Sequence, residues 1–308
     1  MEMRAIGPIP VPLAGIGCNN FGRRIDEART REVVDAAFEA DATLFDTADL
    51  YGDGRSEEYL GRSLGSRRDR AVIVSKFGMR TPPDGMTGGD PRWVVRACED
   101  SLRRLGTDRI DVYLLHTPDD ATPIGDTLTA MSGLVDQGKV RGIGCSNFSA
   151  KQLDEATEAA AELEVRSFVT VQNEFSLLVR EPRDEVLPAC RRLGLSFMPY
   201  FPLASGLLTG KYRRGQPPPP GTRMAGRDGW AEYLTDERFD VVERLASFAE
   251  EHGHTILELA MSWLAVQKEI ATVIAGATTA EQVRENAAAV EAWKLAEDEL
   301  AEIDDLLG

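Results

Sequence analysis

Short apolar runs rich in β-branched residues alternate along the chain with longer segments of helical periodicity, and this cycle repeats about eight times. The apolar runs predict strands at Leu13–Gly17, Thr43–Asp46, Ala71–Ser75, Ile110–Leu115, Val140–Gly144, Phe168–Gln172, Ser196–Tyr200 and Ala271–Ala275. The periodic segments predict helices at Arg29–Glu39, Ser56–Leu64, Pro91–Leu105, Gly125–Gln137, Ala150–Leu163, Asp184–Leu193, Asp236–Gln267 and Ala280–Val290. Strand and helix therefore follow each other in regular turn.

Strands separated by helices must run parallel, because no hairpin joins them, and a parallel sheet needs cover on both faces or closure into a barrel. Eight such units fit a (β/α)8 TIM barrel. The alternative is a doubly wound nucleotide-binding sheet, whose fingerprint is G-x-G-x-x-G after a strand. Gly15-Ile-Gly17 and Gly142-Ile-Gly144 both lack the third glycine. We therefore expect residues 1–308 to form a single barrel domain.

The segment Arg213–Gly229 breaks this rhythm after the seventh predicted strand. Its sequence, RRGQPPPPGTRMAGRDG, is too dense in proline and glycine for regular structure, and Pro217–Pro220 predicts a stiff polyproline turn. The segment is either a domain linker or a long loop at the mouth of the barrel. The single strand that follows is too little for a second domain, so we favour the loop, which in this place is typical of a lid.

Composition and charge narrow the function classes. The chain has 43% hydrophobic and 28% charged residues, as in an ordinary soluble globular protein. Its net charge of −16 opposes nucleic acid and anionic membrane surfaces as partners. The N-terminus lacks the layout of a signal peptide, and the most apolar later stretch, Ile256–Val266, is too short to span a membrane. We expect a cytoplasmic protein whose four scattered cysteines, Cys18, Cys98, Cys145 and Cys190, are reduced thiols.

Four polar residues stand at or just past the carboxyl ends of neighbouring predicted strands, where barrel active sites lie. Asp46 ends the second strand in Leu-Phe-Asp-Thr-Ala, and Tyr51 follows five residues later. Lys76 ends the third strand and His116 the fourth. Taken singly, each has a plain structural role as a helix cap, a packing residue or a solvated charge. Because the three strands are adjacent and parallel, the four side chains must converge on one small volume.

This set suits the protonation of a carbonyl oxygen. A phenol is a poor proton donor at neutral pH, and a nearby ammonium stabilises its phenolate. At about 4 Å and an effective dielectric near 20, the pair is worth roughly 4 kcal/mol, or on the order of 3 pKa units, before the carboxylate takes its share. We therefore expect Lys76 to bring the pKa of Tyr51 close to working pH. Asp46 would hold Lys76, and His116 would orient the substrate oxygen.

Other chemistries lack their residues. His252 and His254 lie far downstream of His116, so we expect no metal site. No Ser or Cys has a base next to it for covalent catalysis. An isomerase or sugar hydrolase on this fold would need a carboxylate pair or a phosphate loop, and the sequence contains neither.

Several separated motifs, in order, resemble those of the aldo-keto reductases over nearly the whole chain. They are Phe45-Asp46-Thr47-Ala48 with Tyr51-Gly52, Ser75-Lys76, Leu115-His116-Thr117-Pro118-Asp119, Gly142-Ile143-Gly144-Cys145-Ser146-Asn147, Gln172-Asn173-Glu174-Phe175, and Gly276 with Gln282 and Glu285-Asn286. The resemblance implies a (β/α)8 barrel closed at the bottom by an N-terminal β-hairpin near residues 2–10. It also implies an extended nicotinamide dinucleotide, with Tyr51 as general acid and Asp46, Lys76 and His116 completing a tetrad.

The resemblance further assigns cofactor contacts. It implies that Ser146, Asn147 and Gln172 bond the nicotinamide carboxamide and that Tyr200 stacks on its ring. The pyrophosphate would run beside Pro202, Leu203, Ala204, Gly206 and Leu208, with Lys211 supplying positive charge. The adenine would meet Glu285 and Asn286, and the adenosine ribose would meet Gly276, Thr278 and Gln282.

The choice between NADP and NAD depends on cations near the ribose 2′ position. Gly276-Ala-Thr-Thr279 carries no Lys or Arg, where many relatives have one. We expect Arg223 from the Pro/Gly-rich loop, together with Thr278 and Gln282, to bind the 2′-phosphate in place of that missing basic residue. We favour NADP and keep NAD as the alternative.

The mouth loops should supply the substrate walls, with Phe21, Phe77, Met79 and Trp230 as the apolar candidates. No further cation is aimed into the pocket, so we expect a small carbonyl substrate without a required carboxylate. The competing hypothesis is a cofactor-binding regulatory or sensor subunit with little turnover. The pattern leaves the number of subunits open.

Overall fold

The computed structural model describes residues 1–225 and 233–308 and is built around one sheet of parallel strands. The strands are β1 Met3–Ile6, β2 Ile9–Pro12, β3 Ala14–Gly17, β4 Leu44–Asp46, β5 Val72–Phe77, β6 Ile110–Leu115, β7 Val140–Ser146, β8 Thr170–Glu174, β9 Ser196–Tyr200 and β10 Val273–Gly276. The α-helices are α1 Glu27–Glu39, α2 Arg55–Leu64, α3 Pro91–Leu105, α4 Ile124–Asp136, α5 Ala150–Glu162, α6 Val186–Leu193, α8 Asp236–Glu251, α9 Ile256–Ala265, α10 Ala280–Ala289 and α11 Glu297–Leu307. Short 3-10 turns are η1 Tyr51–Gly54, η2 Gly65–Arg70, η3 Glu181–Arg183 and η4 Ala204–Thr209.

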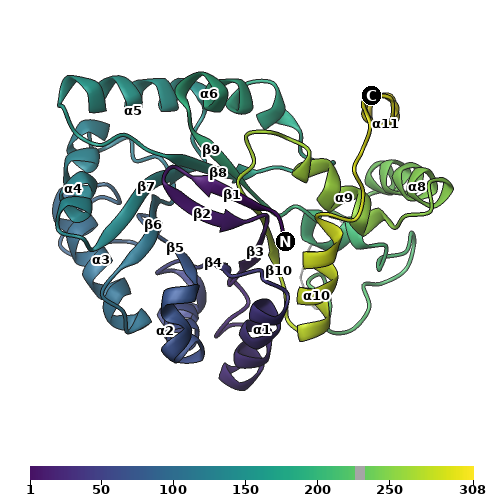
Figure 1. Ribbon diagram of the computed structural model, residues 1–308, viewed down its shortest axis with the longest axis horizontal. Helices are drawn as coiled ribbons and strands as arrows, with labels where there is room; N and C mark the ends of the chain where they lie inside the picture. Colours follow the sequence, from purple (N-terminus) through teal and green to yellow (C-terminus); the bar gives the residue numbers. More distant parts are fainter. Residues whose placement is uncertain (226–232) are drawn as a thin grey trace.

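Eight strands form the sheet in the order β10-β3-β4-β5-β6-β7-β8-β9, and all neighbouring pairs are parallel. The two ends of the sheet meet where Phe197 pairs with Ile270: the Phe197 amide donates to Glu269 (2.7 Å) and the Ala271 amide donates back to Phe197 (3.0 Å). The sheet thus curls into a nearly closed barrel surrounded by helices (Figure 1). The predicted (β/α)8 fold is confirmed, with all eight expected strands found.

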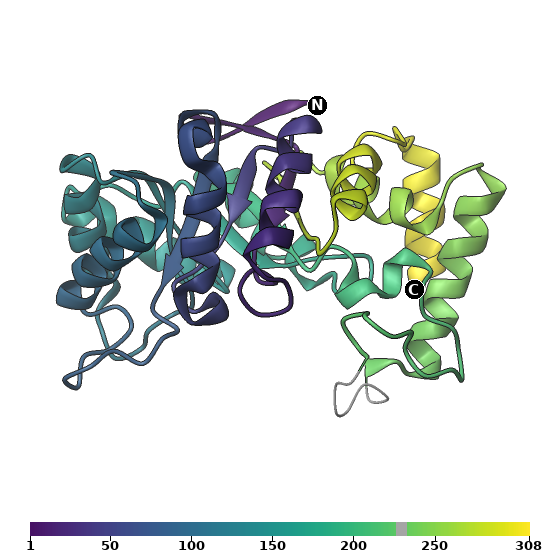
Figure 2. The same ribbon diagram turned by 90° about the horizontal axis from the view of Figure 1, so that it is seen from below.

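The first two strands lie outside this sheet. β1 and β2 pair antiparallel, with Ile6 opposite Ile9, and form the expected N-terminal hairpin. The side chains of Ile6, Ile9 and Val11 are buried against Val74 and Met198 at the bottom of the barrel interior. Figure 2 shows this hairpin at one end of the molecule and the long loop after η4 at the opposite end.

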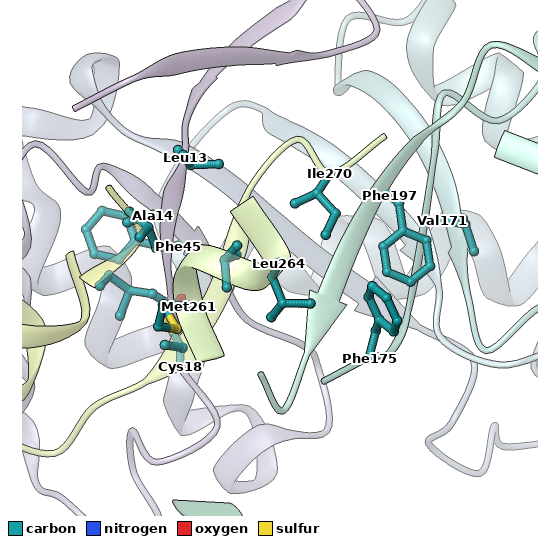
Figure 3. Close-up of a cluster of buried hydrophobic side chains, with 14 of the residues drawn as sticks. Leu13, Ala14, Cys18, Phe45, Val171, Phe175, Phe197, Met261, Leu264 and Ile270 are labelled. Atoms are coloured by element: carbon teal, nitrogen blue, oxygen red, sulfur yellow. The ribbon is translucent and has the colours of Figure 1, made fainter. Parts of the chain in front are cut away.

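A larger apolar cluster fills the space between the barrel and its helices. Figure 3 shows part of it, where residues of β3, β4, β8 and β9 meet residues of α9. The rings of Phe175 and Phe197 pack edge to face at 5.8 Å, and Phe175 also contacts the buried Trp263. This core fixes the strands, and therefore the positions of the residues at their carboxyl ends.

The helix predictions were wrong at one point and incomplete at another. The single helix expected over Asp236–Gln267 is two, α8 and α9, because Gly253 takes a left-handed φ of 76° and Thr255 begins α9 with a capping box to Glu258. The C-terminal helix α11 was not predicted, since its stretch is mostly acidic and buries only Ile303 fully. Residues 210–225 contain no helix or strand, as expected of the Pro/Gly-rich loop. Within the described segments, every helix is too short or too polar to span a membrane.

Candidate active site

The four residues predicted to act together do lie together, at the carboxyl end of the barrel. Asp46 is the last residue of β4, and Lys76 lies one residue before the end of the adjacent β5. His116 follows directly after β6, which pairs with β5. Tyr51 begins η1, the turn between β4 and α2. Parallel neighbouring strands thus bring three of the residues to one rim, and the turn after β4 brings the fourth.

Lys76 is the centre of this group. Its Nζ lies 2.7 Å from Asp46 Oδ1 and 2.8 Å from Oδ2, and it donates to the Thr47 carbonyl at 2.9 Å. A fourth contact, at 3.4 Å, reaches the hydroxyl of Tyr51. The Lys76 side chain is fully buried. A buried ammonium is stable only when such partners surround it, so this arrangement holds a positive charge next to the phenol.

Burial, however, changes the expected acidity of the phenol. Burial raises the pKa of Tyr51 above its ordinary value of 10, and Lys76 only partly opposes this because Asp46 offsets the positive charge. The expectation of a Tyr51 pKa close to working pH is therefore wrong for this geometry: the Coulomb term was right in sign, but it left out the cost of burying a phenolate. At neutral pH Tyr51 keeps its proton. Burial also disfavours the charge on Lys76, but Asp46 and Tyr51 outweigh it and raise the Lys76 pKa.

His116 is held as a neutral ring. Its imidazole is mostly buried and meets the ring of Tyr51 edge-on at 5.9 Å. Burial, helped by the charge of Lys76, lowers the pKa of His116 to about 3. A neutral imidazole keeps one N–H donor, so it can hydrogen-bond to an oxygen near Tyr51 without competing for the proton.

The residues predicted to bond a nicotinamide carboxamide form a continuous hydrogen-bond network beside the tetrad. Ser146 Oγ donates to the Gln172 carbonyl at 2.7 Å, and Asn147 Nδ2 donates to the His116 carbonyl at 2.9 Å. The hydroxyl of Tyr200 donates to Asn147 Oδ1 at 2.8 Å. The Gln172 side chain donates from Nε2 to Asp46 Oδ1 at 2.9 Å. The predicted cofactor side and the tetrad thus share one network.

Three cations gather farther along the mouth. Lys211 lies against the backbone of Gly206, where a Cβ would lie 2.6 Å from its Nζ. Burial, together with the positive charges of Arg24 and Arg223, lowers the pKa of Lys211. Arg24 Nη2 donates to the Gly221 carbonyl at 2.8 Å, and the guanidinium of Arg223 lies over the ring of Phe201 at 4.8 Å. This cluster draws on loops from both sides of the mouth.

Sequence reasoning missed Arg24 in this cluster. The available sign was the Arg23-Arg24 pair directly after the first barrel strand, in a chain that is strongly acidic overall. The neighbouring predicted contacts differ in exposure: Pro202, Ala204 and Leu208 are buried. Leu203 is half-buried.

The predicted adenosine side lies past β10. Gln282 Oε1 accepts from the Thr278 amide at 2.8 Å and lies 3.1 Å from its hydroxyl, so these residues satisfy each other. Asn286 is buried on α10, whereas Glu285 and Gly276 are exposed. The loop that contains Asn20 lies beside this segment, since Asn20 Nδ2 donates to the Ala277 carbonyl at 3.3 Å.

The predicted substrate walls need correction. Phe21 and Phe77 are fully buried in the apolar core, and Phe77 stacks on Tyr113 at 4.7 Å, so neither side chain can line an open mouth. Met79 is 50% exposed, as a wall residue should be. Trp230 lies outside the described residues. Leu50, which precedes Tyr51, is 41% exposed and was not among the predicted wall residues.

The groups at this mouth suit a dinucleotide. Amides and hydroxyls at the ends of β7 and β8 match a carboxamide, and a tyrosine ring after them matches a flat heterocycle. Gly206 leaves room for Lys211 to lie against the main chain, as a phosphate-binding loop requires. His116 Nδ1 and Asn173 Oδ1 are buried without a protein partner among the described residues. Such groups are usually satisfied by a ligand or water.

Comparisons with known proteins agree on one family. The model described as the Aldo/keto reductase family matches residues 14–307. A protein from Arabidopsis thaliana named probable voltage-gated potassium channel subunit beta is 33% identical over 282 residues, which cover 88% of this chain and 84% of that protein. The L-glyceraldehyde 3-phosphate reductase of Escherichia coli O157:H7 is 30% identical over 319 residues, covering 99% and 92% of the two chains.

A solved structure gives the same result. The glycerol dehydrogenase from Gluconobacter oxydans superposes with a TM-score of 0.85 at 27% identity, over 99% of this chain and 95% of that one. The similarity therefore covers the whole barrel and both of its ends.

Proposed function

The chain belongs to the aldo/keto reductase family, and on this premise we propose that it reduces an aldehyde or ketone to an alcohol with NADPH, the proton coming from Tyr51. The observation that carries the proposal is the position of Lys76 Nζ, which contacts both the Asp46 carboxylate and the Tyr51 hydroxyl inside a buried rim. We also propose that residues 1–308 work as a single domain. All four cysteines are free and buried, which supports a cytoplasmic location.

The proposed chemistry needs one hydride and one proton. A bound nicotinamide dinucleotide would supply the hydride to the carbonyl carbon. Tyr51 gives its hydroxyl proton to the carbonyl oxygen, and Lys76 stabilises the phenolate that remains until solvent returns the proton. His116, neutral at working pH, donates a hydrogen bond that orients the same oxygen. Oxidation of the alcohol follows the same steps in reverse.

The cation cluster supports NADP as the cofactor. Lys211, Arg223 and Arg24 come from two loops and bring positive charge to a mouth in a chain with a net charge of −16. We assign Lys211 to the pyrophosphate and Arg223 and Arg24 to the 2′-phosphate. Because nearby like charges repel, the cluster becomes more stable when a dianionic phosphate binds among them.

The proposed substrate class rests on exposed apolar side chains in the loops that follow β4 and β5. Leu50 and Met79 are exposed and apolar, whereas Arg80 is engaged by Asp53 in an ion pair. We therefore propose a carbonyl compound whose substituent is apolar and carries no required carboxylate. Apolar contact at this position favours substrates by the area that they bury.

The alternative function is that of a sensor or regulatory subunit that binds the cofactor and turns over little. The observation in its favour is the name of the Arabidopsis thaliana relative, which describes a channel subunit. The tetrad geometry is expected in a working reductase and is not needed for cofactor binding alone.

A direct assay separates the two. Loss of NADPH absorbance should be followed with a panel of aromatic and aliphatic aldehydes, together with cofactor binding measured by quenching of tryptophan fluorescence. A reductase should show kcat of about 1 s⁻¹ or more with at least one aldehyde. Tight NADPH binding with turnover below about 0.01 s⁻¹ across the panel would support the sensor.

A further inference from the structure

Gln172 bonds directly to the carboxylate that holds Lys76. Its Nε2 lies 2.9 Å from Asp46 Oδ1, across the barrel from β8 to β4. Both side chains are buried, with 2% of Gln172 and 4% of Asp46 exposed. An Asp46 carboxylate paired to Lys76 has no proton to donate, so the amide must present its N–H here. The orientation of the Gln172 amide is therefore set by chemistry.

The same residue is linked to the other predicted nicotinamide contacts. The Gln172 carbonyl accepts from Ser146 Oγ at 2.7 Å and from the Asn147 amide at 3.0 Å. Asn147 in turn accepts from Tyr200 and donates to the His116 carbonyl. Gln172 is therefore the point at which this network joins the Asp46–Lys76 pair.

We propose that Gln172 is a positioning residue that couples cofactor binding to the tetrad, because its one side-chain amide serves both the Asp46 carboxylate and the bound carboxamide. This inference rests on the proposed function for the identity of the ligand. It does not rest on turnover, because the contact with Asp46 exists in the protein itself. It assigns Gln172 a role beyond that of a cofactor contact.

The physical basis is the balance of charge around Tyr51. Asp46 raises the pKa of Tyr51, and Lys76 lowers it. An N–H donated to Asp46 spreads the negative charge of the carboxylate and weakens its opposition to the phenolate. Loss of that N–H should leave Asp46 more effective and move the ionisation of Tyr51 to higher pH. If a bound carboxamide weakens the hydrogen bond from Gln172 to Asp46, the ionisation of Tyr51 should likewise move to higher pH.

The test compares Gln172→Met with the matched control Thr170→Val. Methionine keeps the length of the side chain and removes the N–H. Thr170 is buried on the same strand, and its hydroxyl donates to the Ser196 carbonyl, away from the tetrad. Tyrosinate absorbance is titrated while circular dichroism verifies the fold, and Tyr51→Phe identifies the contribution of Tyr51. We expect the Tyr51 midpoint to rise by about half a unit to one unit in Gln172→Met and to stay in place in Thr170→Val.

A second arm repeats the titration with saturating NADP⁺. Coupling through Gln172 predicts that the shift caused by NADP⁺ differs between the wild type and Gln172→Met, by at least about 0.3 units. Equal shifts in both proteins, or an unmoved midpoint without NADP⁺, would overturn the proposal and leave Gln172 a simple cofactor contact.

Activity provides a further readout. The pH profile of kcat/KM for an aldehyde, followed from neutral pH to above pH 10, should move its basic limb upward in Gln172→Met. A uniform fall with an unmoved limb would contradict the coupling. The two absorbance titrations need no turnover, so an inactive wild type would count against the proposed function while these titrations still test Gln172.

Discussion

At the scale of the residue, the acidity of Tyr51 is set by opposing effects of similar size. Burial disfavours its phenolate, and Lys76 at 3.4 Å favours it. The negative charge of Asp46 opposes part of the effect of Lys76. A tyrosine in this balance stays protonated at neutral pH and loses its proton readily only when a strong base forms next to it. This is what a proton donor to a developing alkoxide requires.

The replacement Tyr51→Phe tests that role. It removes the proton and leaves the ring that packs against His116, so kcat should fall by roughly 10²–10⁴-fold while the Kd for NADPH changes less than about threefold. Initial rates and fluorescence titration measure the two quantities. Unchanged turnover would show that another group supplies the proton.

Arg24 gives a second prediction at this scale. Replacing its guanidinium by Arg24→Gln should weaken NADPH binding by about tenfold, which is about 1.4 kcal/mol, and NADH binding by much less, since NADH lacks the 2′-phosphate. Arg23→Gln makes the same change in charge one residue earlier and should alter neither affinity by more than about twofold. Equal losses of affinity for NADPH and NADH would show that Arg24 binds the pyrophosphate instead of the 2′-phosphate.

Residue predictions from sequence succeeded where topology alone places a side chain. Asp46, Lys76 and His116 follow adjacent parallel strands, so the strand order decides their meeting. Phe21 and Phe77 were misplaced because the direction in which a side chain points, in a loop or at the end of a strand, depends on packing that periodicity does not encode. Tyr113, which stacks on Phe77, lies 36 positions along the chain. Contacts across such separations carry no local pattern.

At the scale of the element, alternation of strand and helix was enough to predict the barrel. Strands β6 and β9 and helix α3 have the predicted bounds, because apolar runs and amphipathic periods are strong there. The break between α8 and α9 depends on the left-handed glycine Gly253. The helical pattern continues across this residue, so the sequence predicted one helix where the structure has two. Helix α11 packs on α8 through few buried residues, so its own sequence hardly marks it as structured.

The crossing of α2 over α3 depends on one glycine. A Cβ on Gly61 would lie 2.6 Å from the carbonyl carbon of Leu105, so the two helices can approach only because that atom is absent. Gly61→Ala should therefore lower the free energy of unfolding by about 1–3 kcal/mol through overpacking. Gly133→Ala in α4, where a Cβ meets nothing within 4 Å, should raise it by up to about 1 kcal/mol. Urea unfolding of both variants measures the difference, and equal effects would contradict this packing.

At the scale of the whole molecule, charge is distributed unevenly. The chain has 51 acidic and 35 basic residues, yet the mouth collects Arg24, Lys211 and Arg223. Such a local positive field in an acidic protein attracts an anionic dinucleotide to the carboxyl end of the barrel and repels it elsewhere.

A second uneven feature is a buried pair of carboxylates behind the tetrad. Asp49 is 2% exposed, and neither of its oxygens has a protein partner among the described residues. Nearby Glu57 is fully buried and bonded by Arg104 at 2.7 Å. Burial and the charge of Glu57 raise the pKa of Asp49 to about 7, against the pull of Arg104 and Arg80. Tyr113 faces the same space from β6.

This carboxyl links stability to pH. In the unfolded chain Asp49 should ionise near its ordinary pKa of 3.8, whereas in the fold it keeps its proton up to about pH 7. The folded state thus binds more protons between these values, so the free energy of unfolding falls as pH rises from 4 to 7 and stays low above it. Asp49→Asn removes this titration. Relative to the wild type, the variant should gain stability between pH 5 and pH 8, by about 3 kcal/mol at most.

Urea unfolding at the two pH values measures that gain, with Asp69→Asn as the control. Asp69 is exposed, and Arg109 lowers its pKa, so its contribution changes only at pH values below the ordinary pKa of an aspartate. Asp69→Asn should therefore differ from the wild type by the same amount at pH 5 and pH 8. If Asp49→Asn also differs by one constant amount, Asp49 is ionised in the fold at both pH values, and the buried pair must be balanced by Arg104 and Arg80 instead of by a proton.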